Sequence, residues 1–172
     1  EERWREYLGG PTAANLLGFV SEYEDGKGKY GVEKKFDDAL SGSAGKIVGD
    51  KDGRGFLIAL ANLSGVEAEA GADLFLTIEP NLQKEAEKEL RLLKKSWSPL
   101  SGGALVLEPQ TGRILALAAF PEFDPNEYQK EKQMDVFLNP FVEKIFELGS
   151  VFKPLTMAAA LNEGAVTPET TY

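Results

Sequence analysis

The expected strand 113–119 carries only aliphatic side chains after Arg113, and it constrains the fold more than any other stretch. A strand that is apolar along its whole length has both of its faces covered in a folded protein. A second strand is expected over 103–107, because residues 108–112 between the two contain the proline and glycine that favour a chain reversal. The chain is therefore predicted to contain an antiparallel hairpin inside a layered domain.

An amphipathic helix is predicted over residues 81–95, before this hairpin. Apolar side chains recur at helical spacing on one face, namely Leu82, Ala86, Leu90 and Leu93. Asn81 is the expected N-cap. The acidic residues of this segment are assigned to a solvated face, among them Glu85, Glu87 and Glu89.

The chain changes character at residues 72–73. The part before this point is rich in glycine, with apolar runs of strand length over 16–20 and 56–61. Turn signals separate these runs, at Asp25-Gly26, Ser41-Gly42 and Asp52-Gly53. A further strand is expected over 74–78, which Pro80 ends. We therefore expect an α+β chain: a strand-rich domain over 1–72, and antiparallel sheet packed with helices over 73–172.

Histidine and cysteine are both absent, which excludes several classes of site. Without histidine there is no Ser-His-Asp triad and no histidine-ligated zinc. Without cysteine there are no disulfides, thiolate nucleophiles or iron–sulfur clusters. We expect neither a cofactor nor a metal ion, and any catalysis must depend on Ser, Thr, Tyr, Lys or carboxylate groups.

The charge balance argues against nucleic acid as a partner. The chain carries 19 Lys and Arg against 28 Asp and Glu, a net charge of −9, whereas phosphate binding requires clustered positive charge. The longest apolar runs, 56–61 and 114–120, are far shorter than a membrane span. The sequence begins without Met and shows no signal peptide, so we expect a piece of a longer protein.

Two Ser-x-x-Lys motifs are candidates for nucleophilic catalysis, Ser43/Lys46 and Ser150/Lys153. On a helix, positions i and i+3 share a face, so a desolvated lysine amine can accept the serine proton. Ser150 is expected to open an apolar helix that ends near Gly164, the expected C′ residue, whereas Ser43 lies in a glycine-rich stretch without a helix. Ser150 is therefore the candidate nucleophile and Lys153 its candidate base. The structural alternative is an N-cap serine beside a lysine whose amine reaches solvent.

Three other motif matches are not interpreted as binding sites, and two of them, 26–31 and 50–55, are interpreted as turns. The stretch 26–31 fits a dinucleotide-binding pattern but follows acidic residues instead of a strand. Gly45-Lys46 lacks the other residues of a phosphate-binding loop. The stretch 50–55 resembles a calcium loop, but Arg54 occupies a ligand position.

Three stretches follow one another along the chain: the expected hairpin 103–118, the segment 123–126 after it, and residues 139–154 around Ser150. Together they resemble the class B penicillin-binding proteins. Residues 103–118 look like the first hairpin of that family's transpeptidase domain, and 123–126 like its exit. Residues 139–154 are similar to the pattern N-R-A-V-x-x-x-Y-E-P-G-S-x-x-K-P. This sequence differs from that pattern at Pro140, Phe141, Phe146 and Leu148.

The resemblance also extends upstream. Residues 74–83 look like the strand and helix that lead into the catalytic domain. Residues 13–20 and 31–33 are similar to the family's pedestal domain, where the family usually has His at the position of Asn15.

The resemblance implies peptidoglycan cross-linking by a D,D-transpeptidase. Ser150 would attack the bond between the terminal D-alanines of a stem peptide, Lys153 would take the hydroxyl proton, and β-lactams would acylate the same serine. The implied partners are stem peptides, β-lactams, and cell-wall proteins such as a glycosyltransferase or a division or elongation complex. The implied location is extracytoplasmic, with an N-terminal membrane helix in the parent protein.

The family's Ser-x-Asn and Lys-Thr/Ser-Gly elements are absent from these residues. We therefore expect this piece to be inactive alone. Residues 114–120 and the Ser150 helix would lack covering partners, so association with another copy, or disorder near the C-terminal end, is expected. Two alternatives stay open: a non-enzymatic cell-wall scaffold with a decayed site, and a β-lactam sensor or serine β-lactamase.

Overall fold

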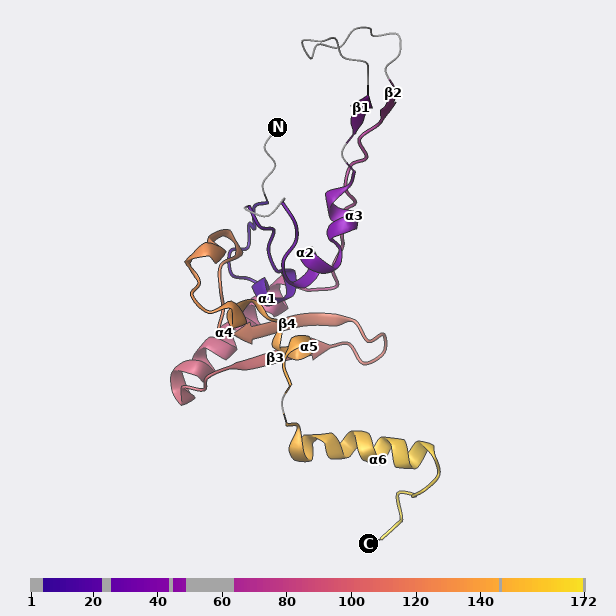
Figure 1. Cartoon of the computed structure of the whole chain (residues 1–172). Helices are drawn as coiled ribbons and strands as arrows, with labels where there is room; N and C mark the ends of the chain where they lie inside the picture. Colours follow the sequence, from indigo (N-terminus) through magenta and orange to yellow (C-terminus); the bar gives the residue numbers. More distant parts are fainter. Residues whose placement is uncertain (1–4, 23–25, 44, 49–63, 146, 172) are drawn as a thin grey trace, which may run out of the picture.

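A computed structural model describes residues 5–22, 26–43, 45–48, 64–145 and 147–171 (Figure 1). The N-terminal part contains α1 (Ala14–Leu17), α2 (Gly31–Lys35), α3 (Asp37–Ser41), β1 (Lys46–Val48) and β2 (Ser64–Val66). The middle contains α4 (Pro80–Trp97), β3 (Gly102–Leu107) and β4 (Ile114–Phe120). The remaining elements are the 3-10 turns η2 (Pro125–Lys130), η3 (Met134–Phe137) and η4 (Gly149–Phe152), with helices α5 (Pro140–Glu143) and α6 (Lys153–Asn162).

The predicted hairpin and helix are confirmed. β3 and β4 pair antiparallel, with Leu105 opposite Leu117, and α4 packs against them. Leu90 of α4 lies against Ala118 and Phe120, and residues 116–120 are buried, as expected for a strand covered on both faces. The expectation that 114–120 would lack covering partners is therefore wrong for 116–120, because α4 and α1 lie against this strand.

The start of α4 differs from the prediction. Glu79 is the N-cap, and Pro80 occupies the first helical position in place of Asn81. Proline fits there because it has no amide hydrogen to lose and its φ angle is already helical. The buried face is also rotated from the predicted one, since Gln83, Glu87 and Leu90 are buried while Leu93 is half exposed.

The strand predicted over 74–78 does not form. These residues carry no ladder pairing, and they approach β4 only at their end, where Thr77 Oγ1 donates to the Ile114 carbonyl at 2.6 Å. The Glu79 amide then donates to the Leu115 carbonyl at 2.8 Å. The Gln83 side chain takes the next position along the edge of β4, so helix α4 begins where a third strand would have continued.

In the N-terminal part, a helix forms where the sequence predicted a strand. Residues 16–20, predicted as a strand, contain the end of α1, followed by Gly18 and one bridge between Val20 and Gly28. A β-carbon on Gly18, whose φ is +75°, would lie 1.9 Å from the Tyr30 carbonyl oxygen, so glycine permits this close crossing. The stretches 56–61 and 52–53 and residue Asp25 lie outside the described residues.

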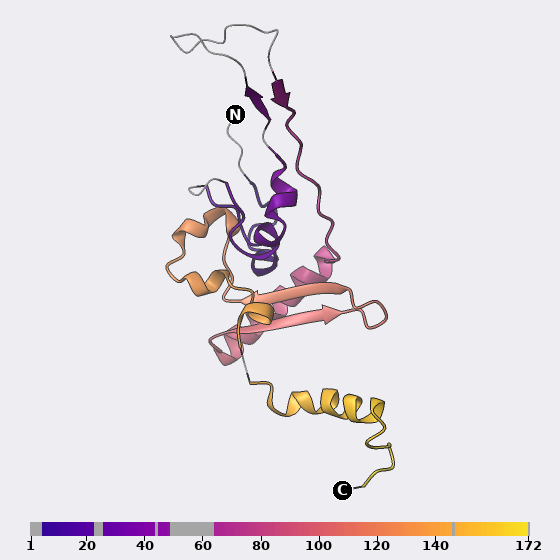
Figure 2. The ribbon, with the colours of Figure 1, turned by 45° about the vertical axis from the view of Figure 1, so that its right-hand side comes forward.

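The described N-terminal part is less rich in strands than expected. It contains three short helices and a hairpin of two three-residue strands, Lys46–Val48 and Ser64–Val66. This hairpin projects from one end of the molecule, and α6 extends from the other (Figures 1 and 2).

An aromatic cluster joins the two expected domains. Its buried members are Ala14 and Phe19 from the N-terminal part and Phe123, Val136 and Phe137 from the C-terminal part. Tyr128 stacks on Phe19 with ring centroids 4.1 Å apart. The boundary at residues 72–73 stays a prediction, and this core shows that the parts on either side pack together.

Candidate active site

Ser150 and Lys153 stand at the start of the C-terminal helix. Ser150 lies in the turn η4, and α6 follows directly from Lys153, whose amide donates to the Ser150 carbonyl. Gly164 ends the segment as predicted, with φ +66°, and the Ala165 amide bonds the Ala160 carbonyl at 2.9 Å. This is the hydrogen bond of a Schellman motif. The spacing of the two site residues thus corresponds to about one helical turn.

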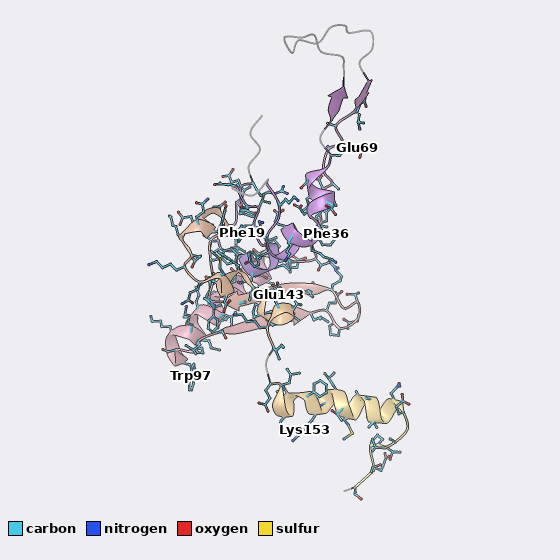
Figure 3. The ribbon with its side chains drawn as sticks, viewed as in Figure 1. Phe19, Phe36, Glu69, Trp97, Glu143 and Lys153 are labelled. Carbon is cyan, nitrogen blue, oxygen red and sulfur yellow. The ribbon has the colours of Figure 1, made fainter. Side chains whose placement is uncertain are left out.

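Both candidate side chains are exposed in this structure. No hydrogen bond or ion pair is found between Ser150 and Lys153, although both residues lie in the described part of the chain. Their apolar neighbours are exposed too: Val151 is 72% exposed and Leu155 62%. Figure 3 shows Lys153 on the helix that stands apart from the sheet. The expected desolvation of the lysine is therefore not present in these residues, whereas the expected exposure of the Ser150 helix is confirmed.

The segment that leads to Ser150 is anchored by α5. Asn139 is buried, and its Oδ1 accepts a hydrogen bond from the Phe141 amide at 3.0 Å. In return, Glu143 Oε2 accepts from the Asn139 amide at 2.6 Å, so cap and helix bond each other. Residues 144–149 then connect α5 to Ser150. Phe141, one of the departures from the family pattern, lies over Gly103 of β3, where a β-carbon would be 2.5 Å from its ring.

Asn15 holds the segment before α5. Its side chain is 7% exposed, and its Nδ2 donates to the carbonyls of Val136 at 2.8 Å and Leu138 at 3.2 Å. Sequence reasoning noted this residue only as a departure from histidine, because its partners lie more than 120 residues later in the chain.

Glu87 was assigned to a solvated face, and this is wrong. It is 6% exposed, and its Oε1 accepts from the Ala13 amide at 2.8 Å and from Gln83 Nε2 at 2.7 Å. Gln83 in turn bonds both backbone groups of Leu117. One sequence signal was available: Gln83 and Glu87 are four residues apart, on the same helix face as the apolar residues Ala86 and Leu90.

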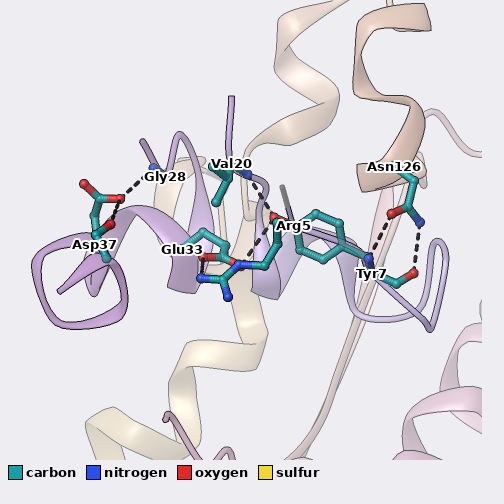
Figure 4. Close-up of polar contacts among 8 residues, drawn as sticks. Arg5, Tyr7, Val20, Gly28, Glu33, Asp37 and Asn126 are labelled. Atoms are coloured by element: carbon teal, nitrogen blue, oxygen red, sulfur yellow. Dashed lines mark hydrogen bonds and ion pairs between the residues drawn. The ribbon is translucent and has the colours of Figure 1, made fainter. Parts of the chain in front are cut away.

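A second polar cluster lies away from Ser150 (Figure 4). Arg5 pairs with Glu33 at 3.0 Å, and Tyr7 Oη donates to Glu33 and accepts from the Val20 amide. Burial, followed by the charge of Glu33, raises the pKa of Tyr7 above its ordinary value. A cavity of about 680 Å³ adjoins this cluster, and none of its lining residues belongs to η4 or α6.

The competing motif matches have structural roles. Ser43 forms a backbone bridge with Glu69, and Lys46 follows on strand β1, so no helix places them together. In the stretch 26–31, Gly28 pairs with Val20, and Gly31 opens α2. The calcium-like stretch 50–55 lies outside the described residues. No described helix combines the length of a membrane span with the hydropathy that one needs.

Comparisons with known proteins point to one family. Residues 102–172 match the family model described as the penicillin-binding protein transpeptidase domain. The chain is 33% identical to penicillin-binding protein PbpB of Mycolicibacterium smegmatis, over 96% of this chain and 25% of that protein. It is also 33% identical to peptidoglycan D,D-transpeptidase FtsI of Escherichia coli K12, over 96% of this chain and 27% of that protein.

Solved structures agree with these matches. Penicillin-binding protein 2X of Streptococcus thermophilus is similar with a TM-score of 0.73 and 28% identity, over 98% of this chain and 26% of that chain. Penicillin-binding protein 3 of Mycobacterium tuberculosis, complexed with aztreonam, gives a TM-score of 0.71 and 29% identity, over 99% of this chain and 34% of that chain. The chain thus spans about a quarter of the length of the curated relatives described above.

Proposed function

Since this chain is related to the class B penicillin-binding proteins, and its residues 102–172 belong to their transpeptidase domain, we propose that it functions in a peptidoglycan D,D-transpeptidase. The observation that carries the proposal is the placement of Ser150 and Lys153. They stand at the junction of η4 and α6, within the residues that match the family. A relative named as a D,D-transpeptidase and another solved with a β-lactam support this substrate class.

The proposed reaction is acyl transfer through a serine ester. Ser150 Oγ attacks the carbonyl carbon between the two terminal D-alanines of a stem peptide, and the Lys153 amine takes the hydroxyl proton. The C–N bond breaks, and the terminal D-alanine leaves with a proton. An amine of a second stem peptide then attacks the ester, which forms the cross-link and frees Ser150. The Ser150 amide supplies one hydrogen bond to the developing oxyanion.

Lys153 requires a drier environment than it has here. A lysine amine accepts a proton only when it is neutral, and burial favours the neutral form. Its neighbours in the sequence, Val151, Phe152 and Leu155, carry exposed apolar surface. We therefore propose that other parts of the protein cover α6 and remove water from Lys153. These residues contain no Ser-x-Asn or Lys-Thr/Ser-Gly element, so we propose that they do not catalyse the reaction on their own.

The wider role is proposed from the relatives. We assign the protein to cell-wall synthesis outside the cytoplasm, anchored to the membrane, with β-lactams as inhibitors. Its partners would be a glycosyltransferase and a division or elongation complex.

A labelled penicillin tests the mechanism. The full-length protein is incubated with fluorescent penicillin, and the covalent adduct is located by peptide mass spectrometry. Labelling of Ser150 is expected, together with its loss in Ser150→Ala and its retention in the matched control Ser43→Ala. Labelling of Ser150→Ala at full strength, or labelling on a different serine, would overturn the proposal. Loss of acylation in a folded Lys153→Ala variant with its noncovalent affinity unchanged is expected if Lys153 acts as the base.

A further inference from the structure

Helix α1 is joined by buried and part-buried hydrogen bonds to both parts of the framework around the candidate site. At its start, the Ala13 amide donates to Glu87 Oε1 at 2.8 Å, and Glu87 is linked through Gln83 to β4. Two residues later, Asn15 Nδ2 donates to the Val136 and Leu138 carbonyls. Together, the Ala13 and Asn15 bonds are called the α1 clamp below. The clamp fixes the segment before α5 relative to the central hairpin.

We propose that Asn15 is a positioning residue for acyl transfer at Ser150, an inference that rests on the proposed function. Asn15 does not touch Ser150; it acts through the chain between them. The carbonyl of Leu138, which Asn15 bonds, belongs to the residue immediately before Asn139, the cap of α5. If the Asn15 bonds are removed, residues 136–138 lose their only described side-chain hydrogen bonds to α1, and the chain that leads through α5 to Ser150 gains conformational freedom.

The connection between α5 and Ser150 is short. Residues 144–149 separate the end of α5 from Ser150, and a tether of six residues reaches at most about 20 Å. The position of α5 therefore limits where Ser150 and its turn η4 can lie. A small error in the placement of a nucleophile lowers its rate because reaction requires close approach and alignment.

Asn15 is suited to this role by its chemistry and its burial. A primary amide has two N–H donors, and here one nitrogen donates to two carbonyls, 2.8 and 3.2 Å away. Asp has nearly the same shape but no donor when ionised, and its charge repels the carbonyl oxygens. His presents one ring N–H, which can serve one of the two carbonyls.

The experiment separates positioning from loss of stability by measuring two quantities in the full-length protein. The acylation rate constant with fluorescent penicillin reports on the folded molecules, whereas the amplitude of labelling reports how many molecules are folded. Asn15→Asp and Asn15→His are compared with Asp37→Ala. This control removes a comparable N-terminal hydrogen bond, from the Gly28 amide to Asp37 at 2.8 Å, and Asp37 makes no described contact with residues 134–143.

Asn15→Asp is expected to lower the acylation rate constant about fivefold, which corresponds to about 1 kcal/mol in the barrier, with an unchanged noncovalent affinity for the penicillin. Asn15→His should recover part of this loss, and Asp37→Ala should stay within about twofold of wild type. An Asn15→Asp variant that changes only the labelling amplitude, or a control that slows equally, would overturn the proposal.

Hydrogen exchange makes this test independent of the proposed function. The amides of Phe141, Val142 and Glu143 all bond to Asn139, so peptides covering 136–143 should exchange faster in Asn15→Asp, while peptides from α4 should not. If wild-type protein is never acylated at Ser150, the proposed function fails, and this exchange difference still decides whether Asn15 anchors the segment. Unchanged exchange over 136–143 would show that it does not.

Discussion

The side chain of Gln83 bonds Leu117 as a neighbouring strand would. Its Nε2 donates to the Leu117 carbonyl at 2.9 Å, and its Oε1 accepts from the Leu117 amide at 2.8 Å. One edge of β4 pairs with β3, and these two bonds satisfy the opposite edge at its centre. Because Gln83 has no exposed surface, a helix side chain here completes a sheet edge without water.

Replacement of Gln83 should therefore lower the free energy of unfolding more than the replacement of most other buried polar residues. Gln83→Leu leaves the Leu117 amide and carbonyl buried without partners, and each unpaired group costs about 1–3 kcal/mol. We expect the free energy of unfolding to fall by about 2–6 kcal/mol, measured by urea denaturation. Gln110→Ala, in the exposed turn between β3 and β4, is the control and should change it by less than about 0.5 kcal/mol. Equal losses in both variants would contradict this account of the edge.

Glu87 offers a test in which one substitution keeps the interaction and another removes it. A single oxygen of Glu87 accepts both of its described hydrogen bonds, so the amide oxygen of Glu87→Gln can replace it. Glu87→Ala instead leaves the Ala13 amide and one Gln83 donor without this acceptor, at about 1–3 kcal/mol for each. In urea denaturation, the free energy of unfolding should be nearly unchanged in Glu87→Gln and lower by about 2–6 kcal/mol in Glu87→Ala. A Gln variant as weak as the Ala variant would indicate that the negative charge itself is required.

These two residues show where sequence reasoning reached its limit. Helical spacing located α4 correctly, because periodicity depends on neighbours along the chain. It assigned Glu87 to solvent because one of its partners, the Ala13 amide, lies 74 residues earlier in the chain. The hairpin was predictable for the same local reasons as the helix: an apolar run, a turn with proline and glycine, and a second apolar run.

The strand predicted over 74–78 does not form, for a different physical reason. Residues 74–78 have the composition of a strand, but a strand requires a partner with free backbone groups. Their neighbour β4 has its opposite edge occupied by Glu79 and Gln83, so the segment stays extended and unpaired. For the candidate site, the sequence predicted that Ser150 opens the helix, whereas Ser150 lies in the turn η4 and α6 begins at Lys153. Asn15, which the inference above assigns to positioning, could not be found by local pattern, because its partners lie in a distant segment.

Two glycines with similar backbone angles give a test of the crossing between α1 and α2. Gly18 and Gly26 have φ of +75° and +66°, but only Gly18 approaches other backbone, with the Tyr30 carbonyl oxygen 1.9 Å from an added β-carbon. Gly26→Ala should lower the free energy of unfolding by about 1–2 kcal/mol, from backbone strain alone. Gly18→Ala adds a backbone clash and should cost at least about 3 kcal/mol in thermal or urea unfolding. Similar costs at both sites would mean that the crossing relaxes easily.

Tyr7 predicts how stability changes in alkaline solution. Burial, and then the nearby charge of Glu33, raises the pKa of Tyr7 in the folded protein above its ordinary value of 10.0. The unfolded chain therefore loses the phenol proton first, and stability falls as pH rises from the unfolded pKa toward the folded one. Between about pH 9 and about pH 11, the urea midpoint of wild type should fall more steeply than that of Tyr7→Phe, which has no phenol to titrate. The other tyrosines and the lysines titrate in both proteins, so the difference in slope isolates Tyr7. Parallel slopes would show that the Tyr7 hydroxyl is as accessible to ionisation in the folded state as in the unfolded one.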